Sequence, residues 1–247
     1  MQCNDIGCVI TRIKDLIRQS LWASGAGGVV LGISGGIDSA VVAALAAKAI
    51  GPEKVIGVSM PAASNTPADH ADAEELCRKF GISLLTVPLD GIVDAAFSCP
   101  ELLNTPVLRG NFSARIRMAV LYNIAASKGY LVCGTSNKTE YLIGYSTKWG
   151  DSAADIQPLL HLLKKDVYAV ARDLEIPDAI LTKVPSAGFW EGQSDESELG
   201  LTYADVDAAL LQLESHNFVP ENPIEETVLE LMKKSQHKRV PAANLLR

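Results

Sequence analysis

A segment rich in glycine and serine, Gly32-Ile-Ser-Gly-Gly-Ile-Asp-Ser39, carries the clearest chemical signal in the chain. Its glycines allow backbone N–H groups to approach a ligand closely, and Ser34 and Ser39 add hydroxyl donors. A helix that starts at this segment contributes partial positive charge, so the pattern predicts a phosphate-binding loop. The Gly-Lys-Ser/Thr of a Walker A loop is missing, and Asp38 is better suited to holding Mg²⁺ than to contacting phosphate.

The same residues allow a second interpretation. Gly32 to Gly36 match G-x-S-x-G, the nucleophile elbow of α/β-hydrolases, with Ser34 as the nucleophile. That elbow needs an oxyanion loop, normally carried by strands upstream of the serine, whereas the pattern here predicts only a helix upstream. The later histidines, at positions 161, 216 and 237, stand in no context typical of a catalytic triad. The phosphate-binding interpretation is therefore favoured over the hydrolase.

The elements that must position this loop alternate regularly. Apolar spacing and Gly or Pro stops predict helices over residues 6–21, 40–50, 68–80 and 111–128, the last capped by Asn111 and ended by Gly129. Short apolar runs predict strands over residues 29–33, 54–60, 82–87 and 130–133. Strands separated by helices favour a parallel sheet covered on both faces. The expected fold class is therefore α/β.

The second half of the chain is less regular. Residues 134–160 are rich in Gly, Thr, Ser, Asn and Asp, which is typical of a site-forming loop with a short helix. Further helices are expected over residues 167–174, 203–214 and 224–235. The polar stretch 183–200 carries four acidic residues in eight positions and predicts a mobile lid or a surface loop. A tail with a basic start, 233–247, ends the chain.

Composition is that of a soluble globular protein. The chain has 247 residues, 48% of them hydrophobic and 21% charged, enough for a large core in a single domain over 1–247. Its 22 basic and 29 acidic residues give a net charge of −7, which argues against nucleic acid as the main partner. No signal peptide is recognisable, and no apolar run approaches the roughly 18 residues of a membrane span. The five cysteines lack CxxC spacing, so a reducing, cytoplasmic setting without disulfides or zinc is expected.

The loop Ser34-Gly-Gly-Ile-Asp-Ser39 resembles the SGGxDS loop of the ATP pyrophosphatase families, which adenylate a substrate oxygen. Further blocks look, in order, like the signatures of the NAD synthetase family; they are Gly110–Met118, Gly134–Glu140, Lys148–Asp151 with Asp155, Pro185–Gly188, Gln193–Gly200 and His237–Arg239. One block would be weak evidence, but the ordered set spans most of the chain. Only 33 residues precede Ser34, so the chain resembles the short, ammonia-dependent form of the family.

This resemblance implies a doubly wound parallel sheet of the adenine-nucleotide α-hydrolase-like type. It also implies ATP-dependent amidation of nicotinic acid adenine dinucleotide (deamido-NAD) by ammonia, through an acyl-adenylate, giving NAD⁺, AMP and pyrophosphate. Mg²⁺ is the implied cofactor and a homodimer the implied assembly. The implied nitrogen source is free ammonia or a separate glutaminase partner.

The resemblance also assigns roles to individual residues. Asp38 and Lys164 are the expected catalytic residues, and Asp38 and Glu140 are the expected Mg²⁺ ligands. The expected ATP-binding residues are Gly32, Ile33, Ser34, Gly35, Gly36, Ile37, Asp38, Ser39, Thr135, Lys164 and Ser186. The expected deamido-NAD-binding residues are Arg115, Lys148, Asp155, His237 and Lys238. Ser186 replaces the threonine of many relatives but keeps the hydroxyl, whereas Trp149 and Trp190 receive no role.

Two other functions stay open at this point. Another adenylating member of the superfamily, acting on a GMP precursor or on tRNA, would share the loop. The charge of −7 counts against tRNA, and no dimerisation domain of the GMP synthetase type is recognisable after residue 200. A nucleotide-binding regulator that has lost its chemistry would also keep the loop, but it would not need the two carboxylates Asp38 and Glu140.

Overall fold

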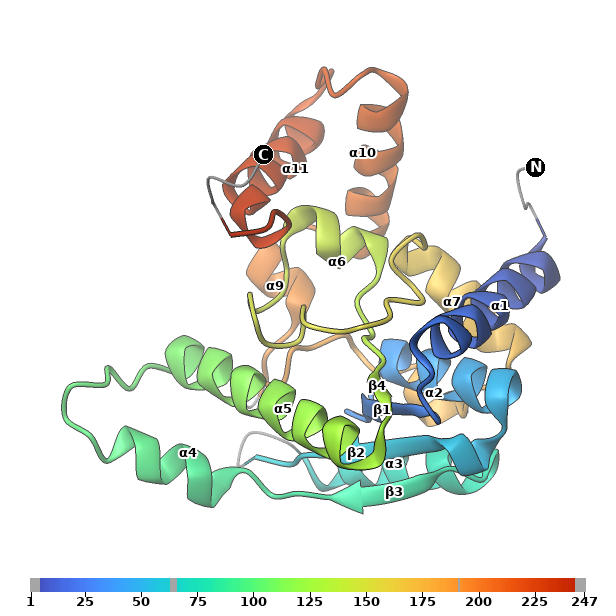
Figure 1. Cartoon of the computed structure of the whole chain (residues 1–247). Helices are drawn as coiled ribbons and strands as arrows, with labels where there is room; N and C mark the ends of the chain where they lie inside the picture. The colour runs from blue at the N-terminus through green and yellow to red at the C-terminus, as the bar shows by residue number, and fades with distance from the viewer. Residues whose placement is uncertain (1–4, 63–65, 191, 243–247) are drawn as a thin grey trace.

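The computed structural model describes residues 5–62, 66–190 and 192–242, and at its centre is a four-stranded parallel sheet (Figure 1). The strands are β1 (Val29–Gly32), β2 (Val55–Ser59), β3 (Ser83–Thr86) and β4 (Leu131–Val132), in the order β3-β2-β1-β4. In β1, Val29 pairs with Val55 on one side and with Leu131 on the other. A parallel bridge from Cys133 to Ile156 adds one further position beyond β4. The predicted α/β fold with a parallel sheet is confirmed.

Helices cover both faces of the sheet, as a doubly wound fold requires. Successive strand residues point to opposite faces, so Val29 and Leu31 belong to one core cluster and Val30 to another. The first cluster includes residues of α1 (Ile6–Ser24), α2 (Ile37–Ile50), α3 (Pro67–Phe80), α7 (Lys164–Asp173) and α8 (Asp178–Leu181). The second includes residues of α4 (Asp90–Phe97) and α5 (Pro106–Lys128). Both faces are therefore buried.

Helix α2, which begins within the Ser34–Ser39 loop, is largely buried. Its residues from Ser39 to Ala47 are all buried, and most of them are alanine or valine. Small side chains allow the helix to lie close to the sheet while α1 and α7 pack on its outer side. The loop at the start of α2 is thereby held on a rigid support.

The C-terminal part forms a third core cluster away from the sheet. It combines α6 (Lys138–Ile143), α10 (Tyr203–Ser215) and α11 (Pro223–Lys234) around Ile143, Leu210 and Val228. Figure 1 shows α10 and α11 standing apart from the sheet, with α6 between them and the strands. The short α9 (Asp195–Leu199) and the 3-10 turns η1 (Pro52–Lys54) and η2 (Gln236–Lys238) complete the described elements.

Local structure differs from the sequence-based expectations in several places. Asn111 does not cap a helix, because α5 starts at Pro106, where Thr105 accepts a hydrogen bond from the Leu108 N–H. Proline at the first helical position after a threonine is the stronger start signal, and Asn111 lies inside α5 with its amide donating to the Val107 carbonyl. Helix α4 was not predicted. The stretch 183–200 is irregular but contains α9.

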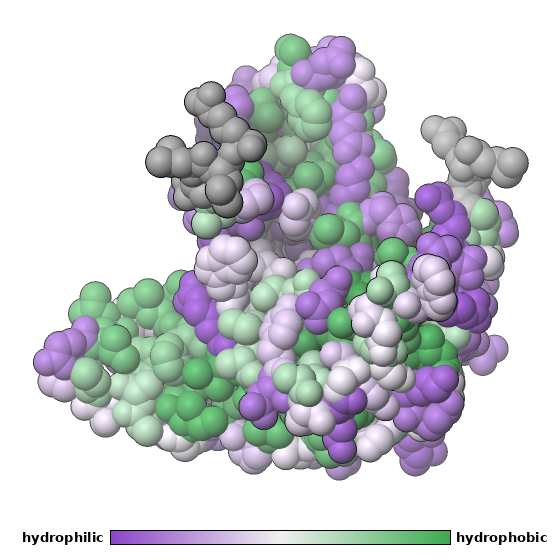
Figure 2. Space-filling model, viewed as in Figure 1, coloured by the Kyte–Doolittle hydropathy of each residue, from purple (hydrophilic) through white to green (hydrophobic). Residues whose placement is uncertain are grey.

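The surface of the α4–α5 end is apolar. Figure 2 shows apolar side chains gathered over this end of the molecule. The exposed large apolar residues there are Ile92, Leu102, Leu103, Val107 and Leu108. No helix within the described ranges is long and apolar enough to cross a membrane.

The cysteines differ in state. Cys77 and Cys133 are buried free thiols, and Cys99 is an exposed one.

Candidate active site

The candidate site lies where the strand order reverses. From β1 the chain proceeds to β2 and β3, which lie on one side of β1 in the sheet. It later returns to β4, which lies on the other side of β1. In open α/β sheets, ligands bind outside the carboxyl ends of the strands at such a switch point. Gly32 ends β1 and is followed by the Ser34–Ser39 loop, and β4 is followed closely by Thr135. Two of the expected ATP-binding segments therefore meet at one edge of the sheet.

The Ser34–Ser39 loop is organised by its own hydroxyl groups. Ser39 Oγ lies 2.9 Å from the Gly36 carbonyl oxygen and 3.2 Å from Ser34 Oγ. The Gly36 N–H donates to Ser34 Oγ at 3.2 Å. Gly36 is also the N-cap residue of α2 and supplies no side-chain cap. An anion placed at this helix start would meet oriented N–H and O–H donors.

The two isoleucines of the loop segment have a different role. Ile33 and Ile37 are buried in the core and anchor the loop to it. Gly32 lies close to Met60 and Leu121, since a Cβ at this position would meet their side chains at 3.5 and 3.8 Å. These three residues shape the loop, and contacts from them to a nucleotide would be made by their backbone.

Beside the loop, Lys164 is buried between two carboxylates; we call Lys164, Asp38 and Glu140 the Lys164 cluster. Lys164 Nζ lies 2.7 Å from Asp38 Oδ2 and 2.8 Å from Glu140 Oε1, and its side chain is 3% exposed. The three residues come from the starts of α7, α2 and α6. The structure thus brings together the residues expected to act in catalysis and to hold Mg²⁺.

Further residues hold the Lys164 cluster in place. The Asn137 amide donates to Asp38 Oδ1 at 2.9 Å, and its oxygen accepts from the Glu140 N–H, which caps α6. The buried Asp207 of α10 accepts from the Thr139 hydroxyl and the Lys165 N–H. Thr139 Oγ1 in turn accepts from the Lys164 N–H. Two helix starts are therefore fixed relative to each other by buried hydrogen bonds.

Electrostatics keep the cluster paired. Burial opposes the charged form of Lys164, but Asp38 and Glu140 outweigh it and raise the pKa of the amine. Burial raises the pKa of the Glu140 carboxyl, and the Asp38 carboxylate adds to this rise while Lys164 opposes it. The Tyr203 ring lies 4.9 Å from Lys164 Nζ and its hydroxyl lies 3.3 Å from Glu140 Oε1. The cluster therefore places one charged amine and two carboxylates beside the Ser34–Ser39 loop.

A metal ion at this point would find oxygen ligands from two side chains. Among the residues that the structure describes, no group of three or more His, Cys, Asp or Glu side chains could hold a metal ion by itself. Mg²⁺ does not need such a group, because it is commonly held by one or two carboxylates together with water and substrate phosphates. Asp38 and Glu140 fit that donor set.

Four of the five residues expected to bind deamido-NAD lie along one chain of contacts. Arg115 Nε of α5 donates to the Lys148 carbonyl at 3.3 Å. Lys148 Nζ donates to the His237 carbonyl at 2.5 Å, and Lys238 Nζ donates to the Gly144 and Ser146 carbonyls at 2.8 and 2.7 Å. These contacts join α5, the 144–151 loop and η2 within one chain.

Two expected site residues lie outside these contacts. Asp155 accepts from the Val132 N–H at 2.8 Å and from the Tyr122 hydroxyl at 3.4 Å, so it supports the end of β4. Ser186 is exposed in the 183–200 stretch, where its hydroxyl accepts from the Gly188 N–H. Sequence reasoning assigned no role to Asn137, although it lies in the Gly134–Glu140 block, and no pattern pointed to Asp207 or Tyr203.

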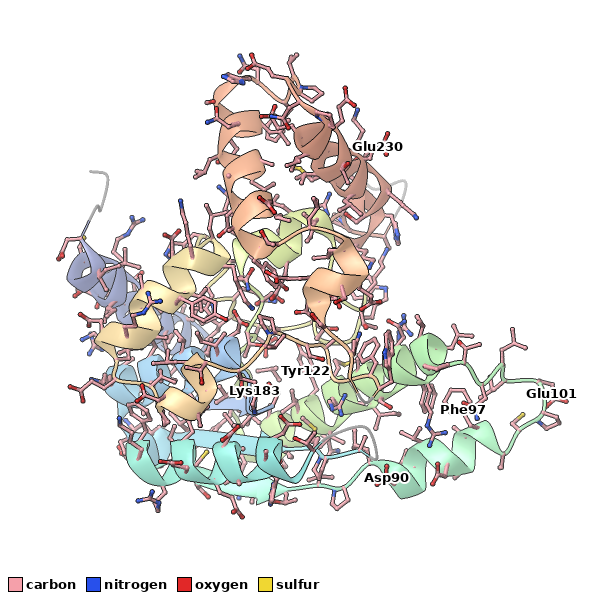
Figure 3. All side chains as sticks on the ribbon, turned by 180° about the vertical axis from the view of Figure 1, so that it is seen from behind. Asp90, Phe97, Glu101, Tyr122, Lys183 and Glu230 are labelled. Carbon is pink, nitrogen blue, oxygen red and sulfur yellow. The ribbon has the colours of Figure 1, made fainter. Side chains whose placement is uncertain are left out.

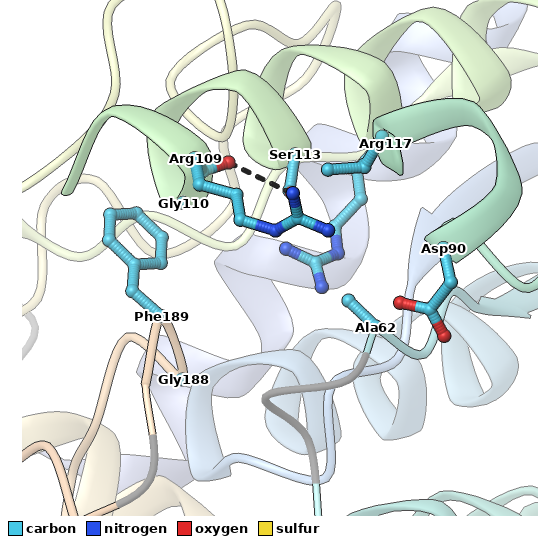
Figure 4. Close-up of a pocket in the computed structure, with 9 residues that line it drawn as sticks. Ala62, Asp90, Arg109, Gly110, Ser113, Arg117, Gly188 and Phe189 are labelled. Atoms are coloured by element: carbon cyan, nitrogen blue, oxygen red, sulfur yellow. Dashed lines mark hydrogen bonds between the residues drawn. The ribbon is translucent and has the colours of Figure 1, made fainter. Parts of the chain in front are cut away.

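The 183–200 stretch packs against α5 at one point. Phe189 lies directly on Gly110, since a Cβ at Gly110 would come within 2.2 Å of the Phe189 ring. Figure 4 shows this contact at the rim of a small pocket between α4, α5 and the 183–200 stretch. The pocket is lined by Ala62, Asp90, Val93, Arg109, Gly110, Ser113, Arg117, Gly188 and Phe189. A glycine is required at position 110 for this close approach.

Comparison with known proteins identifies the family of the chain. The family model described as NAD synthase matches residues 9–242. An NH3-dependent NAD⁺ synthetase from Methanoregula boonei is 49% identical over 242 residues, covering 98% of each chain. The solved NH3-dependent NAD synthetase of Campylobacter jejuni superposes with a TM-score of 0.84 at 31% identity, covering 98% of this chain and 100% of that chain. A solved NMN synthetase from Francisella tularensis gives a TM-score of 0.90 at 35% identity, covering 98% and 99%. The chain belongs to the NAD synthase family.

Proposed function

We propose that this chain is an ATP-dependent ligase that amidates deamido-NAD with ammonia, giving NAD⁺, AMP and pyrophosphate. The Lys164 cluster beside the Ser34–Ser39 loop carries the proposal, because it places a buried cation and two carboxylates at a phosphate-binding helix start. The relatives named NH3-dependent NAD⁺ synthetases match 98% of the chain and support the same reaction.

The chemistry must bring a substrate carboxylate to the α-phosphate of ATP, where both partners are negative. The nicotinate oxygen attacks phosphorus, pyrophosphate leaves, and ammonia then displaces AMP from the activated carbonyl. In the proposal, the Gly35 and Gly36 segment and the hydroxyls of Ser34 and Ser39 bind the phosphates through N–H and O–H groups. Lys164 stabilises the negative charge that develops there. Backbone of the loop residues, together with Thr135 and Ser186, completes the ATP site.

Mg²⁺ is part of the proposal, held by Asp38 and Glu140. The bound ion would neutralise charge on the phosphates of ATP. Lys164 already pairs with both carboxylates, so the cluster keeps its geometry before the ion and ATP arrive.

Deamido-NAD is proposed to bind at the contacts between α5, the 144–151 loop and η2. Arg115, Lys148, His237 and Lys238 supply positive charge or N–H donors for its phosphates. Asp155 is kept as a substrate residue by resemblance, although its carboxylate supports β4 in the structure. The 183–200 stretch would close over the site as a lid, with Phe189 on Gly110 as one contact.

The proposal also covers the oligomeric state, the nitrogen source and the cellular compartment. The chain would act as one domain in a homodimer, and the exposed apolar residues at the α4–α5 end support a self-association surface. No nucleic acid or membrane partner is assigned. The nitrogen source would be free ammonia or a separate glutaminase, and the reaction is placed in the cytoplasm, where ATP is available.

A second candidate substrate follows from the solved NMN synthetase, whose fold matches over nearly the whole chain. An enzyme that makes NMN by amidation would start from nicotinic acid mononucleotide. This acid corresponds to deamido-NAD without its AMP half. The same loop and Lys164 cluster would perform that amidation without change. Substrate choice then rests on residues that contact the AMP half.

The test is a product assay with purified chain, ATP and Mg²⁺. Deamido-NAD and nicotinic acid mononucleotide are offered separately, each with ammonium or with glutamine. NAD⁺ formed from deamido-NAD with ammonium alone is the expected result. NMN formed at a higher kcat/KM would replace the dinucleotide with the mononucleotide. No product from a folded chain under every condition would refute the ligase.

A further inference from the structure

A second lysine, Lys183, contacts the phosphate-binding loop, although no motif singles it out. It follows α8 and starts the 183–200 stretch, and Figure 3 shows it lying over α3. Its Nζ lies 3.2 Å from the Gly35 carbonyl oxygen and 2.9 Å from Asp69 Oδ1, and it also donates to the Asp72 carboxylate. We call Lys183, Asp69 and Asp72 the Lys183 cluster.

The bond to Gly35 fixes the orientation of one peptide plane. In a trans peptide the carbonyl and the N–H of the next residue point in opposite directions. The Gly35 carbonyl faces Lys183, while the Gly36 N–H faces Ser34 Oγ at 3.2 Å. Glycine on both sides would otherwise leave this plane free to rotate. Lys183 therefore holds the Gly36 N–H on the side of the loop that carries the serine hydroxyls.

Helix α3 supports the same peptide from behind. Gly35 has a positive φ of 77°, and a Cβ there would lie 2.6 Å from the Asp69 carbonyl oxygen. Asp69 also caps α3 with Thr66, so its position is set by the helix start. The loop thus rests on the first turn of α3, with Lys183 as the cation that joins the two.

The charge balance makes Lys183 necessary for an anion-binding loop. Asp69 and Asp72 would otherwise place two unpaired carboxylates against a segment that binds polyphosphate. Burial opposes the charged form of Lys183, but its bonds to Asp72 and Asp69 outweigh this and raise the pKa of the amine. The lysine stays charged at neutral pH and neutralises part of that field.

We propose that Lys183 is a positioning residue for ATP: it orients the Gly35–Gly36 peptide, screens Asp69 and Asp72, and fastens the start of the Ser186 segment to the loop. It acts through the loop, since its amine is bonded to the Gly35 carbonyl and not to the N–H side. The inference rests on the proposed function only in that the loop binds ATP.

The experiment measures Mg·ATP affinity by isothermal titration calorimetry, which requires no second substrate. Lys183→Met is compared with Lys183→Arg and with Lys79→Met, a matched control in which a lysine of α3 also donates to a backbone carbonyl, that of Glu175. We expect Lys183→Met to weaken ATP binding about tenfold, the effect of losing one charge-assisted hydrogen bond. Lys183→Arg should recover most of the affinity, and Lys79→Met should bind like the wild type.

Steady-state kinetics separate positioning from general damage. Lys183→Met should raise KM for ATP by a similar factor while KM for deamido-NAD and the midpoint of thermal unfolding change little. Equal ATP affinity in Lys183→Met and the wild type would overturn the inference. Absence of ATP binding by the wild type would instead refute the proposed function. If Lys183→Met does not fold, Lys183→Gln takes its place, which removes the charge but keeps an N–H donor. A two- to threefold weaker ATP affinity is then expected, and unchanged affinity would overturn the inference.

Discussion

Two lysines contact the same loop, each between two carboxylates, yet their surroundings differ. Lys164 is 3% exposed, and its partners Asp38 and Glu140 are 18% and 17% exposed. Lys183 is 28% exposed, with Asp69 at 25% and Asp72 at 13%. A deeply buried ion pair is strongly destabilising to break, because the partner charge stays uncompensated, whereas a more exposed pair contributes little to stability.

The difference assigns the two clusters different tasks. The Lys164 cluster joins the starts of three helices, and its loss would disturb the fold as well as the chemistry. The Lys183 amine and the Asp69 carboxylate are more exposed, so water can solvate both when their bonds open, whereas Asp72 is only 13% exposed. We therefore expect the Lys164 cluster to be a rigid support for the proposed chemistry, and the Lys183 cluster to hold less rigidly a segment that is proposed to move.

The largest effect is expected for Lys164→Met. It leaves Asp38 and Glu140 facing each other, so the free energy of unfolding should fall by about 3 kcal/mol, as when one partner of a buried pair is removed. NAD⁺ formation should fall at least about a hundredfold, the scale of losing one preorganised charge-stabilising donor. Urea denaturation and the product assay measure the two effects.

The matched control is Lys165→Met, the next residue, which is exposed and contacts Asp207 through its backbone N–H. It should leave the free energy of unfolding within about 0.5 kcal/mol of the wild type, and the rate of NAD⁺ formation within about twofold. If the two variants behave alike, the buried cluster has no special role.

A smaller effect is expected for Asp207→Ala. It removes the acceptor for the Thr139 hydroxyl and the Lys165 N–H, so stability should fall by about 2 kcal/mol. The rate should fall about tenfold because the start of α7 that carries Lys164 is released. Asp205→Ala on the same helix removes only the capping box with Thr202 and should cost about 1 kcal/mol with unchanged KM for ATP. Equal kinetics in the two variants would contradict the positioning role of Asp207.

High salt should affect the stability of the two clusters differently. At about 1 M salt the Debye length is about 3 Å, so partly exposed charges are screened while buried ones are not. The stability difference between wild type and Lys183→Met should shrink between about 0.05 and 1 M NaCl, and that for Lys164→Met should persist. Denaturation curves at both salt concentrations test this, and a parallel loss in both variants would remove the distinction.

The smallest effect concerns pH and Asp69. Burial acts against its ionised form, but the bonds from Lys183 and Thr66 prevail and lower the pKa of Asp69 below 3.8. A lowered folded-state pKa stabilises the protein above the unfolded value and loses this contribution as pH falls through the folded one. Wild type should therefore exceed Asp69→Asn in stability at pH 6, with the gap closing below pH 3.8. A gap that persists to the lowest pH would show that another contact stabilises Asp69.

Much of the fold could be predicted because its signals are local. The alternation of strands and helices, the Gly129 stop of α5 and the glycine-rich loop after β1 each depend on residues close together in sequence. The start of α5 was missed because Thr105 and Pro106 offered a stronger cap than Asn111.

The fold class, the loop and the motif residues could be predicted from the sequence, since periodicity and glycine placement act over a few residues. Which charges meet depends instead on how the chain packs. Lys164 is 126 residues from Asp38, and Lys183 is 111 residues from Asp72. No local pattern encodes such pairs, because a charge is buried only where the packed fold supplies its partner. The same packing leaves the Lys164 side chain 3% exposed and the Lys183 side chain 28% exposed to water.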